Sequence, residues 1–169
     1  MVGLCATSNI VRLDWLLDSA KHRRALPCKG YLILDDREAE EQYNFSMRKT
    51  IERGNEVRSQ GKTLLEGFSV HLCVGVAGNK SKTNKTPPIK EFKLIISSTG
   101  ASWISSLPDS GKGNNNEDFS NIIIVSSKIA READKQLAVK RIAEAVARGA
   151  RTLTTEDFFR GIMNQKFQF

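Results

Sequence analysis

The sequence is poor in the residues that build most catalytic and metal centres. It holds only 3 Cys and 2 His among its 169 residues, and Cys5, Cys28 and Cys73 include no C-x-x-C pair. Neither a disulfide framework nor a zinc site is therefore indicated. No Ser-His-Asp, Cys-His or metal-ligand spacing emerges either. The sequence thus predicts no catalytic residue, no metal and no cofactor, and a protein of a reducing compartment.

Long apolar runs are also missing. No stretch approaches the roughly 18 apolar residues of a membrane helix, and Met1-Val2-Gly3-Leu4 does not begin the basic n-region of a signal peptide. We therefore expect neither a membrane protein nor a secreted one.

Acidic residues are the minority among the charged ones. The chain has 26 Lys+Arg against 19 Asp+Glu, a formal net charge of +7. Residues 1–63 carry 11 basic and 9 acidic side chains (net +2), and residues 64–169 carry 15 and 10 (net +5). A balance of this size is more often a solvated surface than a site for an anionic partner, and we favour that interpretation.

The second half of the chain carries strand patterns at four places. Residues 68–72 alternate apolar and polar side chains, which is typical of a strand with one buried face. Residues 122–125 form an unbroken β-branched run, which is typical of a strand buried on both faces. Shorter strands are expected around Trp103-Ile104 and at residues 150–153.

Segments with a helical spacing of apolar residues alternate with these strands. Three stripes are expected, carried by Ile89, Phe92, Ile96 and Thr99, by Ala138, Ile142, Ala145 and Val146, and by Phe158 and Ile162 in a helix that opens at Thr154. The order β-α-β-β-α-β-α predicts an α/β fold with a small parallel four-stranded sheet flanked by helices.

The first half predicts helices without a complete sheet. Leu13, Leu16, Leu17 and Ala20 share one face of a helix that ends near residues 21–24, with Trp15 beside that face. Trp15 and Trp103 are most simply core residues. The charged stretch 35–42 is expected to be a solvated connector, and Ser46 to cap a helix that closes at Gly54 or slightly beyond. Residues 35–63 are therefore interpreted as a linker.

Several of these segments resemble the tandem BRCT (breast-cancer-protein C-terminal) repeat family, of the type found in PAX-interacting protein and the mediator of DNA damage checkpoint. The resemblance rests on residues 10–19 as the strand and Trp helix, on residues 26–27 and 31–34 after it, on residues 44–47 and 64–68 as the linker and the first strand of a second repeat, and on residues 156–161 as its last helix. Phe158 stands where the family usually has Trp.

The resemblance implies three parts. Residues 1–34 match the C-terminal part of a first repeat, residues 35–63 a linker with a short helix, and residues 64–169 a complete second repeat. It further implies a non-catalytic nuclear module of the DNA damage response that binds a protein partner, such as a phosphorylated histone-variant tail or another phosphoprotein. The family's phosphate-binding Ser/Thr-Gly pair is expected to fall upstream of Met1, and Val2 occupies the position of its Lys. The phosphate pocket is therefore expected to be incomplete.

The neighbouring peptide pocket of the family matches Pro87, Lys90 and Glu91. Lys90 near a helix N-terminus suits a peptide carboxylate, whereas Glu91 repels one and accepts an N–H or a basic side chain. The competing interpretation is that Pro87-Pro88 merely begins a helix.

Two alternatives remain open. Lys80, Lys82 and Lys85 form a basic loop that suits nucleic-acid phosphates, although no aromatic residue is interleaved to stack bases, so nucleic acid is not favoured. A half repeat also leaves Leu4, Ile10, Leu13 and Leu16 partly uncovered, which predicts a dimerisation surface or an unstable product.

Overall fold

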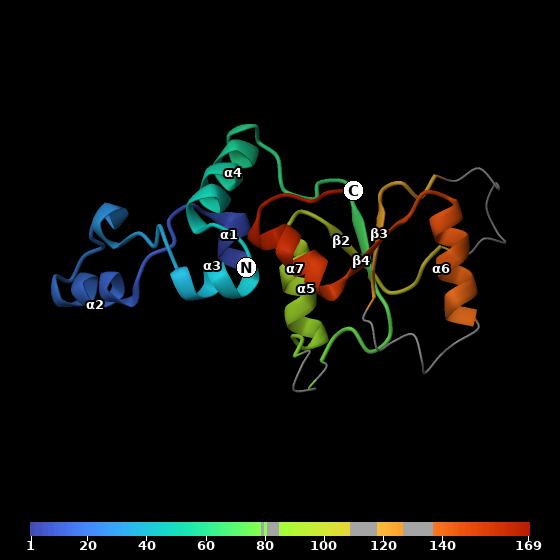
Figure 1. The fold of residues 1–169 in the computed structure, drawn as a ribbon. Helices are drawn as coiled ribbons and strands as arrows, with labels where there is room; N and C mark the ends of the chain where they lie inside the picture. Colours follow the sequence, from blue (N-terminus) through green and yellow to red (C-terminus); the bar gives the residue numbers. More distant parts are fainter. Residues whose placement is uncertain (79, 81–84, 109–117, 127–136) are drawn as a thin grey trace. The chain divides into compact units, whose positions relative to one another are not determined.

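Residues 1–78, 80, 85–108, 118–126 and 137–169 are described by the computed structural model, the backbone alone for residues 137–139. The chain divides into two units (Figure 1). Unit 1 comprises Met1–Leu64 and Arg160–Phe167, and unit 2 comprises Leu65–Phe159 and Gln168–Phe169.

Unit 2 contains a four-stranded parallel sheet. Its strands are β1 Ser69–Leu72, β2 Ser102–Ile104, β3 Ile122–Ser126 and β4 Arg151–Thr154. They lie in the order β2-β1-β3-β4. Val70 of β1 pairs with Trp103 on one side and Ile123 on the other, and Ile124 pairs with Thr152 of β4. The predicted α/β class and parallel four-stranded sheet are confirmed.

Helices cover both faces of this sheet. They are α5 Ile89–Ser98, α6 Leu137–Ala147 and α7 Thr155–Met163. α5 and the beginning of α7 lie on one face, and α6 lies on the other (Figure 1). Each helix forms where the apolar spacing predicts it, because a stripe at a period of about 3.6 residues can be covered by the sheet. Ile89 of the predicted α5 stripe is exposed, since it lies at the first residue of the helix, and Phe92, Ile95 and Ile96 are the buried positions. Val146 of the predicted α6 stripe is nevertheless exposed, since Ala145 and the half-buried Ile142 take the covered positions.

β3 separates two apolar layers. Ile122 and Ile124 pack in one cluster with Leu107, Phe119, Ala145 and Ala150. Ile123 and Val125 are fully buried and point to the opposite face, as the two-residue period of a strand requires. On that side Phe92 of α5 stacks on Phe158 of α7, with ring centroids 6.0 Å apart. The unbroken β-branched run therefore marks the centre of the core.

Unit 1 is helical. Its elements are α1 Val2–Ala6, α2 Leu13–Lys21, the 3-10 turn η1 Cys28–Tyr31, α3 Arg37–Tyr43 and α4 Met47–Ser59, together with the last turn of α7. A single antiparallel bridge joins Val11 to Leu32.

The charged stretch 35–42, predicted as a solvated connector, contains a helix that the sequence pattern did not predict. The stretch forms α3, whose N-terminus is capped by the Asp36 carboxylate, which accepts a hydrogen bond from the Ala39 N–H at 3.2 Å. Glu38 and Glu40 in the first turn add favourable charge at the positive end of the helix. These local terms stabilise a helix that has no apolar stripe for the sequence pattern to reveal.

α4 also differs from its prediction at both ends. Ser46 occupies the N-cap position, but its side chain makes no cap hydrogen bond, and the Glu40 carboxylate accepts from the Met47 N–H at 2.6 Å instead. The helix continues five residues beyond Gly54, to Ser59. Gly54 is buried, and a Cβ there would lie 3.0 Å from Nη1 of Arg58 and 3.3 Å from Oε1 of Gln165. Glycine serves packing here rather than ending the helix.

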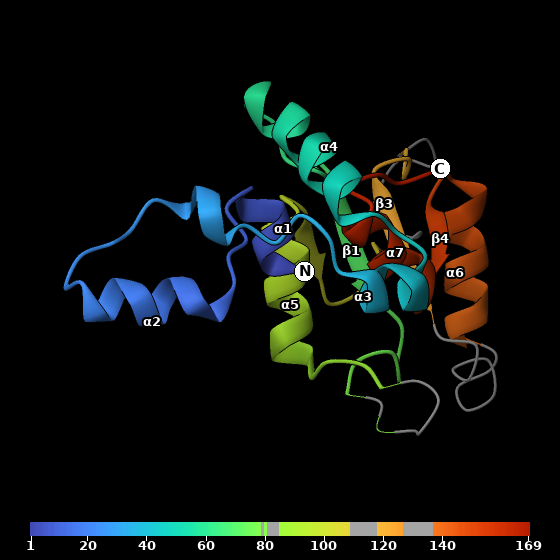
Figure 2. The same ribbon diagram turned by 60° about the vertical axis from the view of Figure 1, so that its left-hand side comes forward.

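α2 turns its leucines outward. Leu13, Leu16 and Leu17 are 69%, 58% and 51% exposed. The helix is held through its other face, where the indole N–H of Trp15 donates to the Leu26 carbonyl at 2.7 Å and the hydroxyl of Ser19 accepts from the Leu26 N–H at 3.1 Å. Figure 2 shows the segment after α2 folding back along it. The expectation that part of this stripe stays uncovered is confirmed.

Neither tryptophan is a buried core residue, contrary to the simplest interpretation. Trp15 and Trp103 are both half-buried. The indole N–H of Trp15 donates to the main-chain carbonyl of Leu26 near the surface. Trp103 lies on the edge strand β2, where the ammonium of Lys93 sits 3.5 Å above its ring.

Candidate peptide-binding site

The predicted site residues lie where the connection from β1 enters α5, at the carboxyl edge of the unit 2 sheet (Figure 1). Pro87 is in the connection, and Lys90 and Glu91 are in the first turn of α5. Two hydrogen bonds fix this connection where it enters α5. The Gly78 N–H donates to the Pro87 carbonyl at 2.7 Å, and the Thr86 hydroxyl donates to the Val76 carbonyl at 2.5 Å. Val76 itself is fully buried. Pro87 is half-buried, and its carbonyl is fixed by the Gly78 N–H.

The N-terminus of α5 has no side-chain cap. Pro88 is its N-cap residue, with extended backbone angles of φ −55° and ψ 154°, and it makes no cap hydrogen bond with a side chain. The first N–H groups of a helix have no partner within the helix and carry its positive end. Lys90 and Glu91 are exposed in this first turn. The arrangement suits an acceptor oxygen of a ligand, with a cation and an anion beside it.

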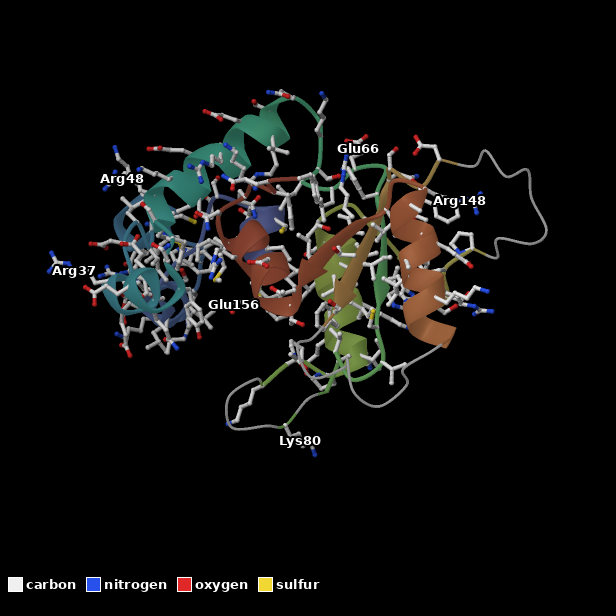
Figure 3. The ribbon with its side chains drawn as sticks, turned by 45° about the vertical axis from the view of Figure 1, so that its right-hand side comes forward. Arg37, Arg48, Glu66, Lys80, Arg148 and Glu156 are labelled. Carbon is white, nitrogen blue, oxygen red and sulfur yellow. The ribbon has the colours of Figure 1, made fainter. Side chains whose placement is uncertain are left out.

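The N-terminus of α7, at the same edge of the sheet, is closed by its own side chains. The hydroxyl of Thr154 accepts from the Asp157 N–H at 3.1 Å and donates to the Asp157 carboxylate at 2.6 Å. Glu156 adds a second carboxylate in this first turn (Figure 3). The predicted start of the helix at Thr154 with Asp157 three residues on is confirmed. An anion is accepted far less readily here than at α5.

Two of the three loop lysines are brought together. Lys80 and Lys85 form an isolated antiparallel bridge, which sets two exposed cations across from one another. The side chain of Lys80 extends away from the sheet in Figure 3. Lys82 lies outside the described residues. A nucleic-acid role for this loop stays a prediction.

Titratable groups near the sheet do not join the site. Burial lowers the pKa of His71, whose Nδ1 lies 3.4 Å from the Ile104 carbonyl, and burial raises the pKa of the Cys73 thiol. Cys73 packs beside the apolar cluster of β3. Across the described part of the chain, no group of three or more His, Cys, Asp or Glu is placed to hold a metal ion. Nor does that part contain a helix long and apolar enough to cross a membrane.

The sequence located Pro87, Lys90 and Glu91 but missed what holds them. The Thr86 hydroxyl and the Gly78 N–H fix the loop through main-chain carbonyls. A carbonyl is present at every residue, so such an acceptor leaves no signal in the sequence. Gly75 and Gly78, with φ +81° and +71°, adopt the left-handed conformation that turns this connection.

Comparison with curated sequences finds similarity to DNA damage checkpoint mediators. The chain is 34% identical over 112 residues to the rat "Mediator of DNA damage checkpoint protein 1" and 33% identical over 112 residues to the human protein of that name, covering 64% of this chain in each case. It spans only 8% and 5% of the length of those relatives. No family model matches the sequence.

The fold has a match among solved structures. The BRCT5-BRCT6 domains of Brc1 from S. pombe superpose with a TM-score of 0.64 at 16% sequence identity, over 98% of this chain and 73% of that one. This likeness shows the fold, a tandem BRCT arrangement.

Proposed function

We propose that this chain, a member of the BRCT repeat family, is a non-catalytic protein-interaction module of the DNA damage response and works in the nucleus. Its partner is a protein segment that presents a carboxylate to Pro87, Lys90 and Glu91 at the start of α5. The proposal includes the domain assignment, with residues 1–34 as part of a first repeat, 35–63 as a linker and 64–169 as a second repeat. The similarity to DNA damage checkpoint mediators supports this class of function.

The observation that carries the proposal is the contrast between two helix N-termini. α5 begins without a side-chain cap and with Lys90 exposed, while α7 is closed by Thr154 and Asp157. Helix N-termini favour anions through their free N–H groups and dipole. Of these two ends, α5 therefore offers the site for an acidic peptide.

Phosphate adds little to binding in this proposal. The resemblance places the family's phosphate-binding Lys at the position of Val2, which offers no charge to a phosphate. Each charge-assisted hydrogen bond contributes about 1.5 to 3 kcal/mol. Losing the one from this Lys raises the dissociation constant by roughly one to two powers of ten.

The test is a titration of the full chain with a labelled peptide that ends in acidic residues and a free carboxylate. Phosphorylated, unphosphorylated and C-terminally amidated forms are compared. We expect the amidated form to bind more weakly and the phosphate to change affinity by less than about tenfold. A phosphate-dependent dissociation constant of about 1 μM or tighter contradicts the incomplete phosphate pocket.

Variants at α5 have opposite expected signs. Lys90→Ala should weaken the unamidated peptide about two- to fivefold, as loss of an exposed ion pair does. Glu91→Gln should strengthen it by up to about twofold, because a repulsive charge is removed. Lys62→Ala, an exposed lysine in unit 1, is the matched control for net charge. Equal effects of Lys90→Ala and Lys62→Ala would assign the binding to net charge and refute the site.

A further inference from the structure

The outward face of α2 is the largest run of exposed leucines in one helix among the described residues. Leu13, Leu16 and Leu17 lie on it, together with the exposed Ala20. These four positions follow the i, i+3, i+4, i+7 spacing of a packing stripe. The opposite face is already committed to the segment that follows the helix, through Trp15 and Ser19. The leucine stripe is therefore available to another molecule.

We propose that a second copy of this chain covers the stripe, with the two α2 helices antiparallel. Two oppositely charged residues border the stripe on the same edge, Asp14 in the first turn and Lys21 in the last. They are seven residues apart, which is about two turns and about 10 Å along the axis. Both are exposed.

In a two-fold symmetric antiparallel pair, this spacing brings opposite charges of the two copies together. A two-fold axis perpendicular to the pair of helices reverses the chain direction but leaves each edge beside the same edge of the other copy. Asp14 of one copy then lies opposite Lys21 of the other, and the reciprocal pair forms at the other end. In a parallel two-fold pair opposite edges of the helix meet, so Asp14 and Lys21 of the two copies do not face each other. The charge order along the helix thus favours the antiparallel pair.

The neighbouring charges are compatible with this arrangement. Lys21 donates to Asp18 of its own helix at 3.1 Å, but its side chain stays 72% exposed and an ammonium has three donors. Arg12, at the N-cap, donates to the Gly30 carbonyl at 3.1 Å and is thereby directed to its own unit. Arg23 and Arg24, just beyond the helix, add positive charge at the end that meets Asp14 of the other copy.

The first measurement is sedimentation velocity of the full chain over a concentration series up to about 100 μM. We expect a monomer–dimer equilibrium within that range. Leu16→Asp should raise the dissociation constant at least about tenfold, because a charge is placed in the centre of the interface. Leu94→Asp is the matched control, since Leu94 is also 58% exposed but lies on α5. Far-UV circular dichroism checks that both variants are folded.

Charge reversal tests the antiparallel arrangement without touching the leucines. Asp14→Lys and Lys21→Asp should each weaken the homodimer by several-fold, as like charges then face each other. A one-to-one mixture of the two variants should restore dimerisation, because both cross-pairs are again of opposite sign. A chain that stays monomeric at about 100 μM, a dimer insensitive to Leu16→Asp, or a mixture that fails to restore association overturns the proposal.

Discussion

The two units of the molecule are stabilised by different interactions. In unit 2 the two central strands and their helices bury a large apolar core, with Phe92, Ile123 and Phe158 all fully buried. In unit 1, Met47 and Ile162 are the buried hydrophobic residues among those described. Its contacts run instead from side chains to main-chain carbonyls.

Three residues of α4 make several of these contacts. Thr50 donates to the Met163 carbonyl at 2.5 Å, Arg53 to the Asn164 carbonyl at 3.1 Å, and Arg58 to the Leu4 carbonyl at 3.1 Å. Each such bond contributes about 1 kcal/mol net, or about 1.5 to 3 when the donor is charged. Burial of one large apolar side chain contributes a comparable 1.5 to 3 kcal/mol or so, and unit 2 has many. Unit 2 is thus expected to carry most of the stability.

The sharpest test of this difference is to separate the parts. A chain of residues 64–169 should unfold cooperatively, because it keeps every strand of the sheet and the stack of Phe68 on Phe169. Residues 1–63 should not fold alone, because the acceptors at residues 163 and 164 are removed. Denaturant unfolding and amide dispersion in NMR measure both. Non-cooperative unfolding of the longer piece contradicts the comparison.

The next largest effect is expected in the core of unit 2. Phe92→Ala removes a fully buried ring that stacks on Phe158 and, at 5.2 Å, on Phe159. We expect a loss of about 3 to 5 kcal/mol in the free energy of unfolding. Leu94→Ala, on the exposed face of the same helix, should cost less than about 1 kcal/mol. Urea unfolding gives both values, and similar losses would show that the core lies elsewhere.

A smaller effect is expected in unit 1. Thr50→Val keeps the shape of a buried side chain but deletes the donor to the Met163 and Ser46 carbonyls. The expected cost is about 1 to 3 kcal/mol, as for a buried hydrogen bond left half unpaired. Ser59→Ala, which breaks only an exposed bond within α4, is the control. A neutral Thr50→Val would mean that these carbonyls find another donor.

The smallest effect is a pH dependence of unit 2. Burial lowers the pKa of His71 below its ordinary 6.5, so the unfolded chain takes up the proton at a higher pH than the folded one. Stability is therefore full above that value and declines as the pH falls through 6.5 toward the folded pKa. His71→Gln should flatten this decline in urea unfolding of residues 64–169. An unchanged slope would assign the decline to other groups.

The sequence was most informative where burial is apolar. The β-branched run of β3 and the helical spacing from Ile89 to Ile96 each predicted an element that the structure confirms. These patterns report directly on which side chains leave water. The capping pair of Thr154 and Asp157 could be predicted for a different reason, because its two partners are close in sequence.

The sequence was least informative where structure rests on main-chain acceptors. α3 is stabilised by a capping residue and by acidic side chains in its first turn, and it has no apolar stripe. α4 continues through Gly54, which packs closely against the side chains of Arg58 and Gln165. The orientation of α2 depends on a carbonyl eleven residues after Trp15. In the candidate site, Lys90 and Glu91 were singled out because the family resemblance places its peptide pocket there, and their role in binding remains a prediction. No sequence pattern predicted the hydrogen bond from the Thr86 hydroxyl to the Val76 carbonyl that fixes the loop.

The hydrogen bonds of α4 have a consequence for how this sequence can drift. The acceptors at Leu4, Met163 and Asn164 are carbonyls, which survive almost any substitution of those side chains. The donors Thr50, Arg53 and Arg58 have no such freedom, because the bond is lost with the side chain. In unit 1, substitutions at the donor positions of α4 should therefore be tolerated poorly. Substitutions at the residues whose carbonyls accept these bonds should be tolerated well.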